Sequence, residues 1–442
     1  MKWSTVLRVI LMLALVSGGM FASQRSLDAN GTPFEVWAVD QSGTAGKLYV
    51  YEGEELQNDA AAAAPEVFDF GGAVASLCLQ QTGSAPVRSH MLTFNPAHTH
   101  AILSYVATGH VVFLDAATRT PLTCVDVGTQ AHAAFPSPDG SYVVVANQNG
   151  KLLQRITTDY GANTFTLDGS ATLNLATCIT PSGAPCQAPG VRPDNAPICP
   201  VLDSTSRLVF TTLRGGGMFV VDGTTTPMSI IAEYDTSTVQ PEGCGGVERD
   251  GRLYINSGNA NPPASYLYSF PLAGLSGSGP YPPNTPAPTV VFSQTGGDYN
   301  THGLALNRAM QGRYLWTADR FANTMEVVDT TTDTLVSTFS LVTRHSSDPA
   351  PDLIAVAPDG GYAFASLRGP CPLTANSTAT NNAVGSTPGV GVIAIQEAGL
   401  RGKLVAVAPI TNPSAPFTCS TVGGSPTLTE RADVHGIAVR LK

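Results

Sequence analysis

Short apolar segments rich in β-branched and aromatic residues alternate with turn residues along most of the chain. One unit begins at His132 and reads HAAFPSPDGSYVVVANQNGKLLQRI, with an apolar run on each side of a Pro-Asp-Gly turn. Pro presets φ for a tight turn and Gly accepts positive φ, so this turn indicates a reversal between antiparallel strands. Tyr142–Ala146, Tyr314–Ala318 and Tyr362–Ser366 are therefore predicted to be second strands of such units.

A unit of about forty residues recurs along the chain. Its seven copies begin near Phe34, His90, His132, Asn195, Glu242, His302 and Asp352. One four-stranded sheet cannot bury both of its faces alone, so repeated sheets pack around a common axis. The segment HGIAVR at 435–440 repeats the first-strand pattern with nothing after it, and the unit at Phe34 lacks such a strand in front. The repeat predicts an all-β, seven-bladed β-propeller in which the C-terminal strand completes the first blade.

Two elements of the repeat resemble the YVTN-type repeats of exported β-propellers. They are DLIAVAPDGGYAFASLRGP, which begins at Asp352, and the hairpin VVDTTTDTLVSTF, which begins at Val327. The resemblance implies one propeller over residues 24–442, similar to lactonase-type propellers and to the propeller of nitrous oxide reductase. That reductase uses histidines at the centre of a propeller face. This chain lacks three of the seven possible histidines and an electron-transfer copper domain, so only the scaffold is implied.

Composition agrees with a turn-rich β protein. The 442 residues are 43% hydrophobic and 13% charged, with 44 Gly and 33 Pro. This mixture is too apolar for a disordered chain and lacks the strict period of collagen. The net charge is −10 and no basic run occurs, which argues against a nucleic-acid partner. The chain has no CxxCH haem signature and no GxxxxGK[ST] phosphate loop, so neither haem nor nucleotide is expected.

The N-terminus and the cysteines indicate export. Residues 1–23 are predicted to be a secretory signal, with Lys2 and Arg8 ahead of the apolar run Val9–Val16. That run is shorter than the roughly 20 residues of a membrane span. All eight Cys lie beyond it, and an even number in an exported chain favours disulfides. We expect a secreted, periplasmic or extracellular protein without a membrane span, and Cys178–Cys186 and Cys371–Cys419 as two candidate pairs.

Candidate chemistry gathers where the channel of a propeller opens. The first strand of each blade lines the channel, and aligning the repeats places comparable residues at the seven strand starts. These are His435, His90, His132, Ala196, Gly243, His302 and Asp352. Four of the eight histidines of the protein thus occupy equivalent positions. The loops between second and third strands add further polar residues to the same mouth, among them His110, Arg214, Arg320 and Arg368.

Two ligands suit this predicted mouth. His90, His132, His302 and His435 are candidate metal ligands, with copper as the first choice and zinc or iron as alternatives, because neutral imidazole suits these metals. An oxidoreductase activity is one form of this hypothesis. Alternatively, His110, Arg214, Arg320 and Arg368, with Asp352, bind a small anionic molecule, since Arg recognises carboxylates bidentately.

A third hypothesis is a non-catalytic extracellular or cell-surface module that binds other proteins. Its weakly charged faces and two Pro/Gly-rich insertions, Pro262–Pro288 and Pro370–Pro388, suit extended interfaces. A polar strand start can also merely hydrogen-bond a neighbouring loop. His98 and His100 fall in a turn on the opposite face and are expected to be solvated.

Overall fold

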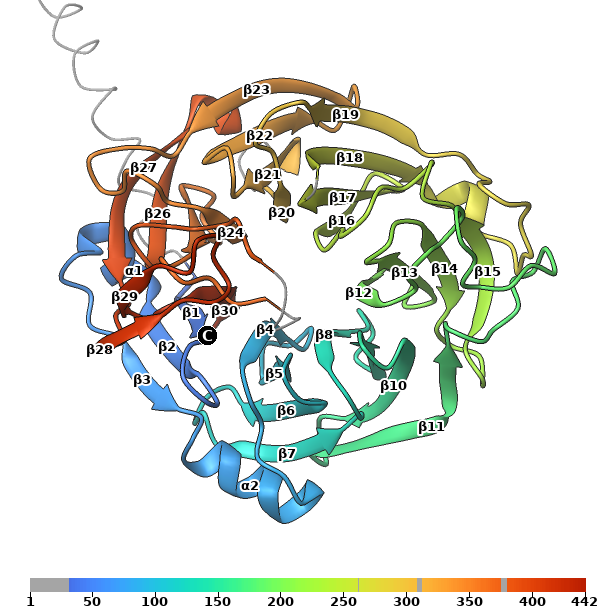
Figure 1. Cartoon of the computed structure of the whole chain (residues 1–442), viewed down its shortest axis with the longest axis horizontal. Helices are drawn as coiled ribbons and strands as arrows, with labels where there is room; N and C mark the ends of the chain where they lie inside the picture. The colour runs from blue at the N-terminus through green and yellow to red at the C-terminus, as the bar shows by residue number, and fades with distance from the viewer. Residues whose placement is uncertain (1–31, 261, 308–311, 375–379) are drawn as a thin grey trace, which may run out of the picture.

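Seven antiparallel four-stranded sheets stand around a central channel in the computed structural model, which describes residues 32–260, 262–307, 312–374 and 380–442 (Figure 1). The prediction of an all-β, seven-bladed propeller closed by the C-terminal strand is confirmed. The predicted signal at 1–23 lies outside the described residues. None of the helices in the described ranges has the length and apolar character needed to cross a membrane.

Each blade is numbered here by its order along the ring, and its strands run from the channel outward. Blade 1 holds β30 (Val434–Leu441), β1 (Phe34–Asp40), β2 (Lys47–Glu52) and β3 (Glu66–Asp69). Blade 2 holds β4 (Ser89–Phe94), β5 (His100–Tyr105), β6 (His110–Asp115) and β7 (Pro121–Asp126). Blade 3 holds β8 (Ala131–Pro136), β9 (Tyr142–Asn147), β10 (Leu152–Asp159) and β11 (Thr164–Asn174). Blade 4 holds β12 (Pro197–Leu202), β13 (Leu208–Leu213), β14 (Met218–Asp222) and β15 (Ser229–Tyr234).

The remaining blades follow the same order. Blade 5 holds β16 (Gly246–Arg249), β17 (Arg252–Ala260), β18 (Pro263–Pro271) and β19 (Thr289–Thr295). Blade 6 holds β20 (Thr301–Leu306), β21 (Tyr314–Asp319), β22 (Thr324–Asp329) and β23 (Thr334–Ser340). Blade 7 holds β24 (Pro351–Val356), β25 (Tyr362–Leu367), β26 (Gly389–Gln396) and β27 (Arg401–Pro409).

The Pro-Asp-Gly turns take the predicted form. Gly140 and Gly360 have φ of 73° and 69°, in the left-handed region that glycine adopts without strain. The amide of Gly140 donates to the carbonyl of Ser137 at 2.9 Å, and Asp139 Oδ1 accepts from the amide of Ser141 at 3.0 Å. The turn therefore satisfies its own polar groups and fixes where the second strand begins.

Ring closure joins the two ends of the described chain. β30 pairs antiparallel with β1 over a register that runs from Phe34 opposite Leu441 to Asp40 opposite Val434. The buried carboxylate of Glu35 fixes this junction, because Arg440 lies 3.0 Å from its Oε2 and Arg119 of blade 2 lies 2.7 Å from its Oε1. The closing strand thus carries an ion pair as well as backbone pairing.

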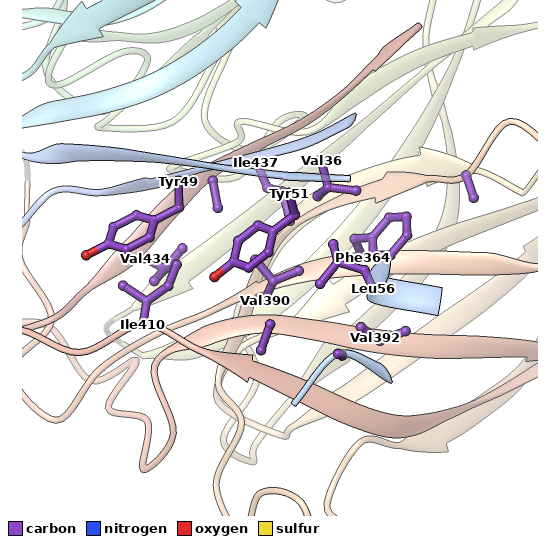
Figure 2. Packing of buried hydrophobic residues seen from close by; sticks show 14 of the residues in the cluster. Val36, Tyr49, Tyr51, Leu56, Phe364, Val390, Val392, Ile410, Val434 and Ile437 are labelled. Atoms are coloured by element: carbon purple, nitrogen blue, oxygen red, sulfur yellow. The ribbon is translucent and has the colours of Figure 1, made fainter. Parts of the chain in front are cut away.

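The hydrophobic core lies between the blades. Each of the seven junctions between neighbouring blades holds its own cluster of buried apolar side chains. Figure 2 shows the cluster where blade 7 meets blade 1, with Val36 and Tyr51 facing Phe364 and Val390. Full burial of one such side chain contributes about 1.5–3 kcal/mol. The ring is held by many moderate contacts of this kind, which leaves its channel side available for polar groups.

Several elements are added to the four-stranded repeat. Helices α1 (Gly53–Asp59) and α2 (Ala73–Thr82) follow strands of blade 1, short 3-10 turns span Leu272–Leu275 and Glu397–Gly399, and β28 (Pro413–Thr418) pairs with β29 (Thr427–Glu430). Four disulfides use all eight cysteines. They are Cys78–Cys124, Cys178–Cys186, Cys199–Cys244 and Cys371–Cys419. Both predicted pairs are confirmed.

Candidate functional site

The four aligned histidines lie together at one end of the channel. His302, His435, His90 and His132 come from the innermost strands β20, β30, β4 and β8, and all four line one cavity of about 160 Å³. Their rings form a continuous arc. The centroids are 5.4 Å apart for His302 and His435, 3.8 Å for His435 and His90, and 4.8 Å for His90 and His132. Four residues spread over 346 positions of sequence, from 90 to 435, thus meet because the repeat places each at a strand start.

Three of the imidazoles have their Nδ1 atoms fixed by oxygen acceptors. Nδ1 of His132 donates to the carbonyl of Ile198 at 2.9 Å, and Nδ1 of His435 donates to the carbonyl of His90 at 3.2 Å. Nδ1 of His90 lies 3.0 Å from Oε1 of Gln41. A carbonyl oxygen only accepts, so in a neutral ring the proton is on Nδ1 and the lone pair is on Nε2.

The fourth imidazole faces a carboxylate. Nδ1 of His302 lies 2.7 Å from Oδ1 of Asp352, although the ring N–H is not aligned for a good hydrogen bond. Nε2 of His435 lies 3.7 Å from the other oxygen, Oδ2. Within the described ranges, His302, Asp352 and His435 offer ligand atoms that all lie within 4.8 Å of one another. Two of the four predicted metal ligands, His302 and His435, thus lie close enough to Asp352 for the three to bind one ion.

Burial keeps these imidazoles neutral. Desolvation is the largest cause of the shift at all four rings and lowers each pKa from its ordinary value. The pKa falls to about 4 for His132 and well below 6.5 for His90 and His435, and it is also lowered for His302. Nearby positive charges, such as Arg368 beside His90, act in the same direction. Neutral imidazole is the form that binds a metal ion.

Asp352 remains ionised although it is fully buried. Burial alone raises the pKa of this carboxyl, but His302 and Arg368 outweigh burial and hold the pKa well below its usual value. Arg368 bonds Oδ2 through one terminal nitrogen, and Arg320 lies 3.3 Å from Oδ1. Both oxygens of Asp352 therefore face positive or hydrogen-bonding groups.

A second carboxylate, Asp433, completes the support of Arg368. The guanidinium donates to Asp433 through Nε at 2.7 Å and through a terminal nitrogen at 2.8 Å, a bidentate pair. Burial lowers the pKa of Arg368, but Asp433 and Asp352 outweigh it and raise the pKa above its ordinary value. Nε2 of Gln41 also donates to Asp433 at 2.8 Å, which turns Oε1 of Gln41 toward His90. One hydrogen-bonded chain thus connects Asp352 with His90.

Two further predicted arginines lie at the rim of the cavity. Nε of Arg214 donates to Asp194 at 2.6 Å, and Nε of Arg320 donates to Oδ1 of Asn300 at 2.6 Å. Both guanidiniums line the cavity together with the four histidines. The predicted gathering of His and Arg side chains at one mouth is thus present for seven residues. They are His90, His132, His302, His435, Arg214, Arg320 and Arg368.

His110 lies elsewhere. It begins β6, and its Nε2 lies 3.0 Å from Oγ1 of Thr82 and 3.2 Å from Oγ of Ser84, at the end of α2. Its Nδ1 lies 2.9 Å from Oγ1 of Thr108, and the ring does not line the cavity. The prediction that His100 is solvated is wrong. His100 is only 6% exposed, because its ring packs beside Tyr160 at the junction of blades 2 and 3.

The sequence analysis missed the side chains that hold the three arginines, although the repeat contains a signal for two of them. Asp194, Asn300 and Asp433 each lie two residues before the aligned strand-start position. Asp194 and Asn300 bind Arg214 and Arg320, each twenty residues further along the same blade. Asp433 binds the equivalent arginine, Arg368, of the neighbouring blade. Aligning the position two residues earlier would have paired Arg214 and Arg320 with their partners. It would not have paired Arg368, whose own blade has Ala350 at that position.

Comparison with known proteins bears on the fold. No model of a known protein family matches the chain, and no curated protein matches it. Among solved structures, the chain is similar to the periplasmic gluconolactonase of Pseudomonas aeruginosa, with 12% identity, a TM-score of 0.57, and 92% of this chain and 99% of that one covered. A protein of Lactobacillus plantarum gives 11% identity and a TM-score of 0.54 over 92% and 99% of the two chains. The likeness is one of fold.

Proposed function

We propose that this protein is an exported β-propeller that binds a transition-metal ion at the mouth of its channel. His302, His435 and Asp352 are the central ligands, with His90 and His132 beside them. The observation that carries the proposal is the orientation of the imidazoles. His90, His132 and His435 turn Nδ1 toward an oxygen acceptor, which leaves the lone pair on Nε2. His302 turns Nδ1 toward Asp352. Metal-binding histidines are held in this way by carbonyls and carboxylates at the other ring nitrogen.

The spacing of two acceptors supports a cation between them. Nε2 of neutral His435 and Oδ2 of ionised Asp352 are 3.7 Å apart, and both carry lone pairs. Zinc–nitrogen and zinc–oxygen distances of about 2.0–2.2 Å allow two ligands up to about 4 Å apart on one ion. Copper is the first candidate, and zinc or iron are the alternatives, because a set of imidazoles with one carboxylate suits each of them.

The charged side chains of the site balance one another, so that the site can accept a cation or an anion. Asp352 and Asp433 together carry two negative charges, and Arg368 and Arg320 carry two positive ones, so the formal sum is zero. A metal ion therefore meets neutral imidazoles and a balanced set of ion pairs. When bound, such an ion supplies Lewis acidity or one-electron chemistry, which is the basis for an oxidoreductase hypothesis.

A small anion is a second candidate ligand. Arg214 and Arg320 line the cavity from blades 4 and 6, on different sides of the mouth. A guanidinium carries five N–H donors, more than the contacts with Asp194, Asn300 and Asp352 use. The pair would bind a carboxylate at the rim, above the imidazoles.

Export is part of the proposal. The predicted signal and the YVTN-type resemblance support it, and so do four disulfides that use every cysteine, a pattern typical of oxidising compartments.

Metal analysis of the purified protein tests the proposal directly. We expect one equivalent of copper, zinc or iron after exposure to the three ions and removal of excess metal. His302→Ala and His435→Ala should each remove it, whereas His110→Ala, a histidine outside the cavity, should retain it. Unfolding curves of all four proteins check that the variants are folded.

Two other results would favour a different ligand or a different function. If no metal binds but carboxylates bind to the wild-type protein and not to Arg320→Ala or Arg214→Ala, the anionic-ligand hypothesis replaces the metal hypothesis. If neither class of ligand binds, the metal and anion hypotheses both fail, and the alternative of a non-catalytic module that binds proteins through its faces is favoured.

A further inference from the structure

A second group of metal-ligating atoms lies in the channel wall beside the histidine arc. Cys199 of β12 and Cys244, just ahead of β16, form the disulfide that joins blades 4 and 5. A ring nitrogen of His132 and the two sulfur atoms all lie within 4.8 Å of one another. The three side chains are buried. Histidine and cysteine at this spacing are a ligand set typical of zinc and copper sites.

Two of these three residues border cavities of the channel. His132 lines the cavity of about 160 Å³ at the histidine end. Cys244 lines a different cavity of about 410 Å³, whose walls are mainly apolar residues of the innermost strands, such as Met91 and Leu353. One cavity therefore borders the group at His132 and another borders it at Cys244, although all three residues are buried.

The other disulfides lack such a neighbour. One attaches α2 to β7, one closes a loop of eight residues, and one ties two connecting segments together. Across the described ranges, only the Cys199–Cys244 pair has a His, Asp or Glu ligand atom within 4.8 Å of both sulfurs.

We propose that Cys199, Cys244 and His132 form a second, redox-dependent metal site. A dithiol reductant transfers two electrons and two protons to the Cys199–Cys244 bond, which breaks into two thiols while the reductant forms its own disulfide. Binding of a soft or borderline ion, Zn²⁺ or Cu⁺, then releases the two thiol protons and uses both thiolates. The oxidised protein holds no ion there, because the disulfide sulfurs have no charge to offer.

The site is distinct from the one proposed above. Its sulfur ligands take no part in the set of His302, His435 and Asp352, and only His132 borders both. The ring of His132 stays beside the sulfur atoms because its Nδ1 donates to the carbonyl of Ile198, the residue next to Cys199. A result for metal binding at one site therefore does not decide whether the other site binds a metal.

Cadmium titration after graded reduction tests this inference. Cd²⁺ bound to thiolates gives an ultraviolet charge-transfer absorption that imidazole and carboxylate ligands do not give. After removal of dithiothreitol, we expect the reduced wild-type protein to bind one more equivalent of Cd²⁺ with this absorption than reduced Cys199→Ser/Cys244→Ser, because the other three disulfides can also yield thiolates. The oxidised protein should show none. The matched pair Cys178→Ser/Cys186→Ser should retain the equivalent that Cys199→Ser/Cys244→Ser loses.

Two more variants separate the ligands. His132→Ala should lower the Cd²⁺ affinity at least about tenfold, a loss that already follows removal of an outer-shell partner in metal sites. His302→Ala should leave the absorption unchanged, whatever it does to metal binding at the first site. The proposal is overturned if the reduced protein shows no absorption, if Cys199→Ser/Cys244→Ser retains that equivalent, or if reduction unfolds the propeller as followed by circular dichroism.

Discussion

The two ends of the channel are built from the same seven strands, yet they have opposite character. At one end, His90 and His435 contribute to a cavity lined by imidazoles and guanidiniums. Two residues further along the same strands, Leu92 and Ile437 line a second cavity, whose wall consists largely of apolar residues. An apolar lining suffices to fill a channel, so the polar end carries a desolvation cost that the fold does not require. The contrast is the reason why we propose the histidine end as the functional one.

Removal of β30 should have the largest effect, because this strand serves both ends. Truncation after Thr429 deletes Asp433 and His435 at the polar end and Ile437 at the apolar end, and it opens blade 1. We expect loss of the cooperative unfolding transition, since the cost approaches the whole stability of a domain, about 5–15 kcal/mol. Circular dichroism during denaturation measures this. A truncated protein that unfolds at the wild-type midpoint would contradict ring closure.

Arg368→Leu should break the polar end selectively. It leaves Asp352 and Asp433 buried without their guanidinium, which costs about 3–5 kcal/mol. Ile437→Ala, at the apolar end, should cost about 2–5 kcal/mol through its cavity. Denaturant unfolding measures both losses, and metal analysis distinguishes them, because only Arg368→Leu should also impair metal binding. Equal metal content in the two variants would show that the ion pairs do not position the site.

Glu326 of β22 contrasts with the paired carboxylates of the polar end, because this buried carboxyl has no cationic partner among its described contacts. Burial, and then the charge of Asp319, raise its pKa from 4.5 to about 8. The folded protein therefore holds a proton that the unfolded chain releases above pH 4.5. This contribution to stability is complete below pH 4.5 and is lost as the pH rises to about 8, at up to about 1.4 kcal/mol per pH unit.

Glu326→Gln should remove that pH dependence. The amide cannot ionise, so the variant should gain stability over the wild-type protein as the pH rises from 4.5 to 8, with little difference below 4.5. Unfolding free energies at several pH values provide the measurement. Parallel profiles of the two proteins would show that Glu326 is ionised in the folded state.

Much of the architecture follows from the sequence because the repeat is local. The Pro-Asp-Gly turns and the alternating strands specify each blade, and the unmatched segment at 435–440 identifies the closing strand. The four histidines could be placed together for the same reason. The network of Asp433, Gln41 and Arg368 could not, because it joins side chains from blades at opposite ends of the sequence, and it depends on distances that a repeat does not encode.

His110 shows the limit of reasoning by equivalence. It begins the third strand of its blade, where the repeat predicts a residue at the channel mouth. The insertion that forms α2 is specific to this region, and Thr82 and Ser84 at its end contact the ring. An insertion supplies a new neighbour that no alignment of repeats contains.

Gly303→Ala should produce the smallest of these effects, and it tests how closely the strands must approach at the polar end. A Cβ at this position would lie 2.5 Å from the carbonyl oxygen of Asp352, closer than real Cβ contacts. β20 and β24 would have to separate, at a cost of about 1–3 kcal/mol. The separation would also move His302 away from Asp352, so metal affinity should fall with stability. Gly423→Ala is the matched control, because nothing lies within 4 Å of its Cβ. If the two variants unfold and bind metal alike, close approach of these strands is not what assembles the site.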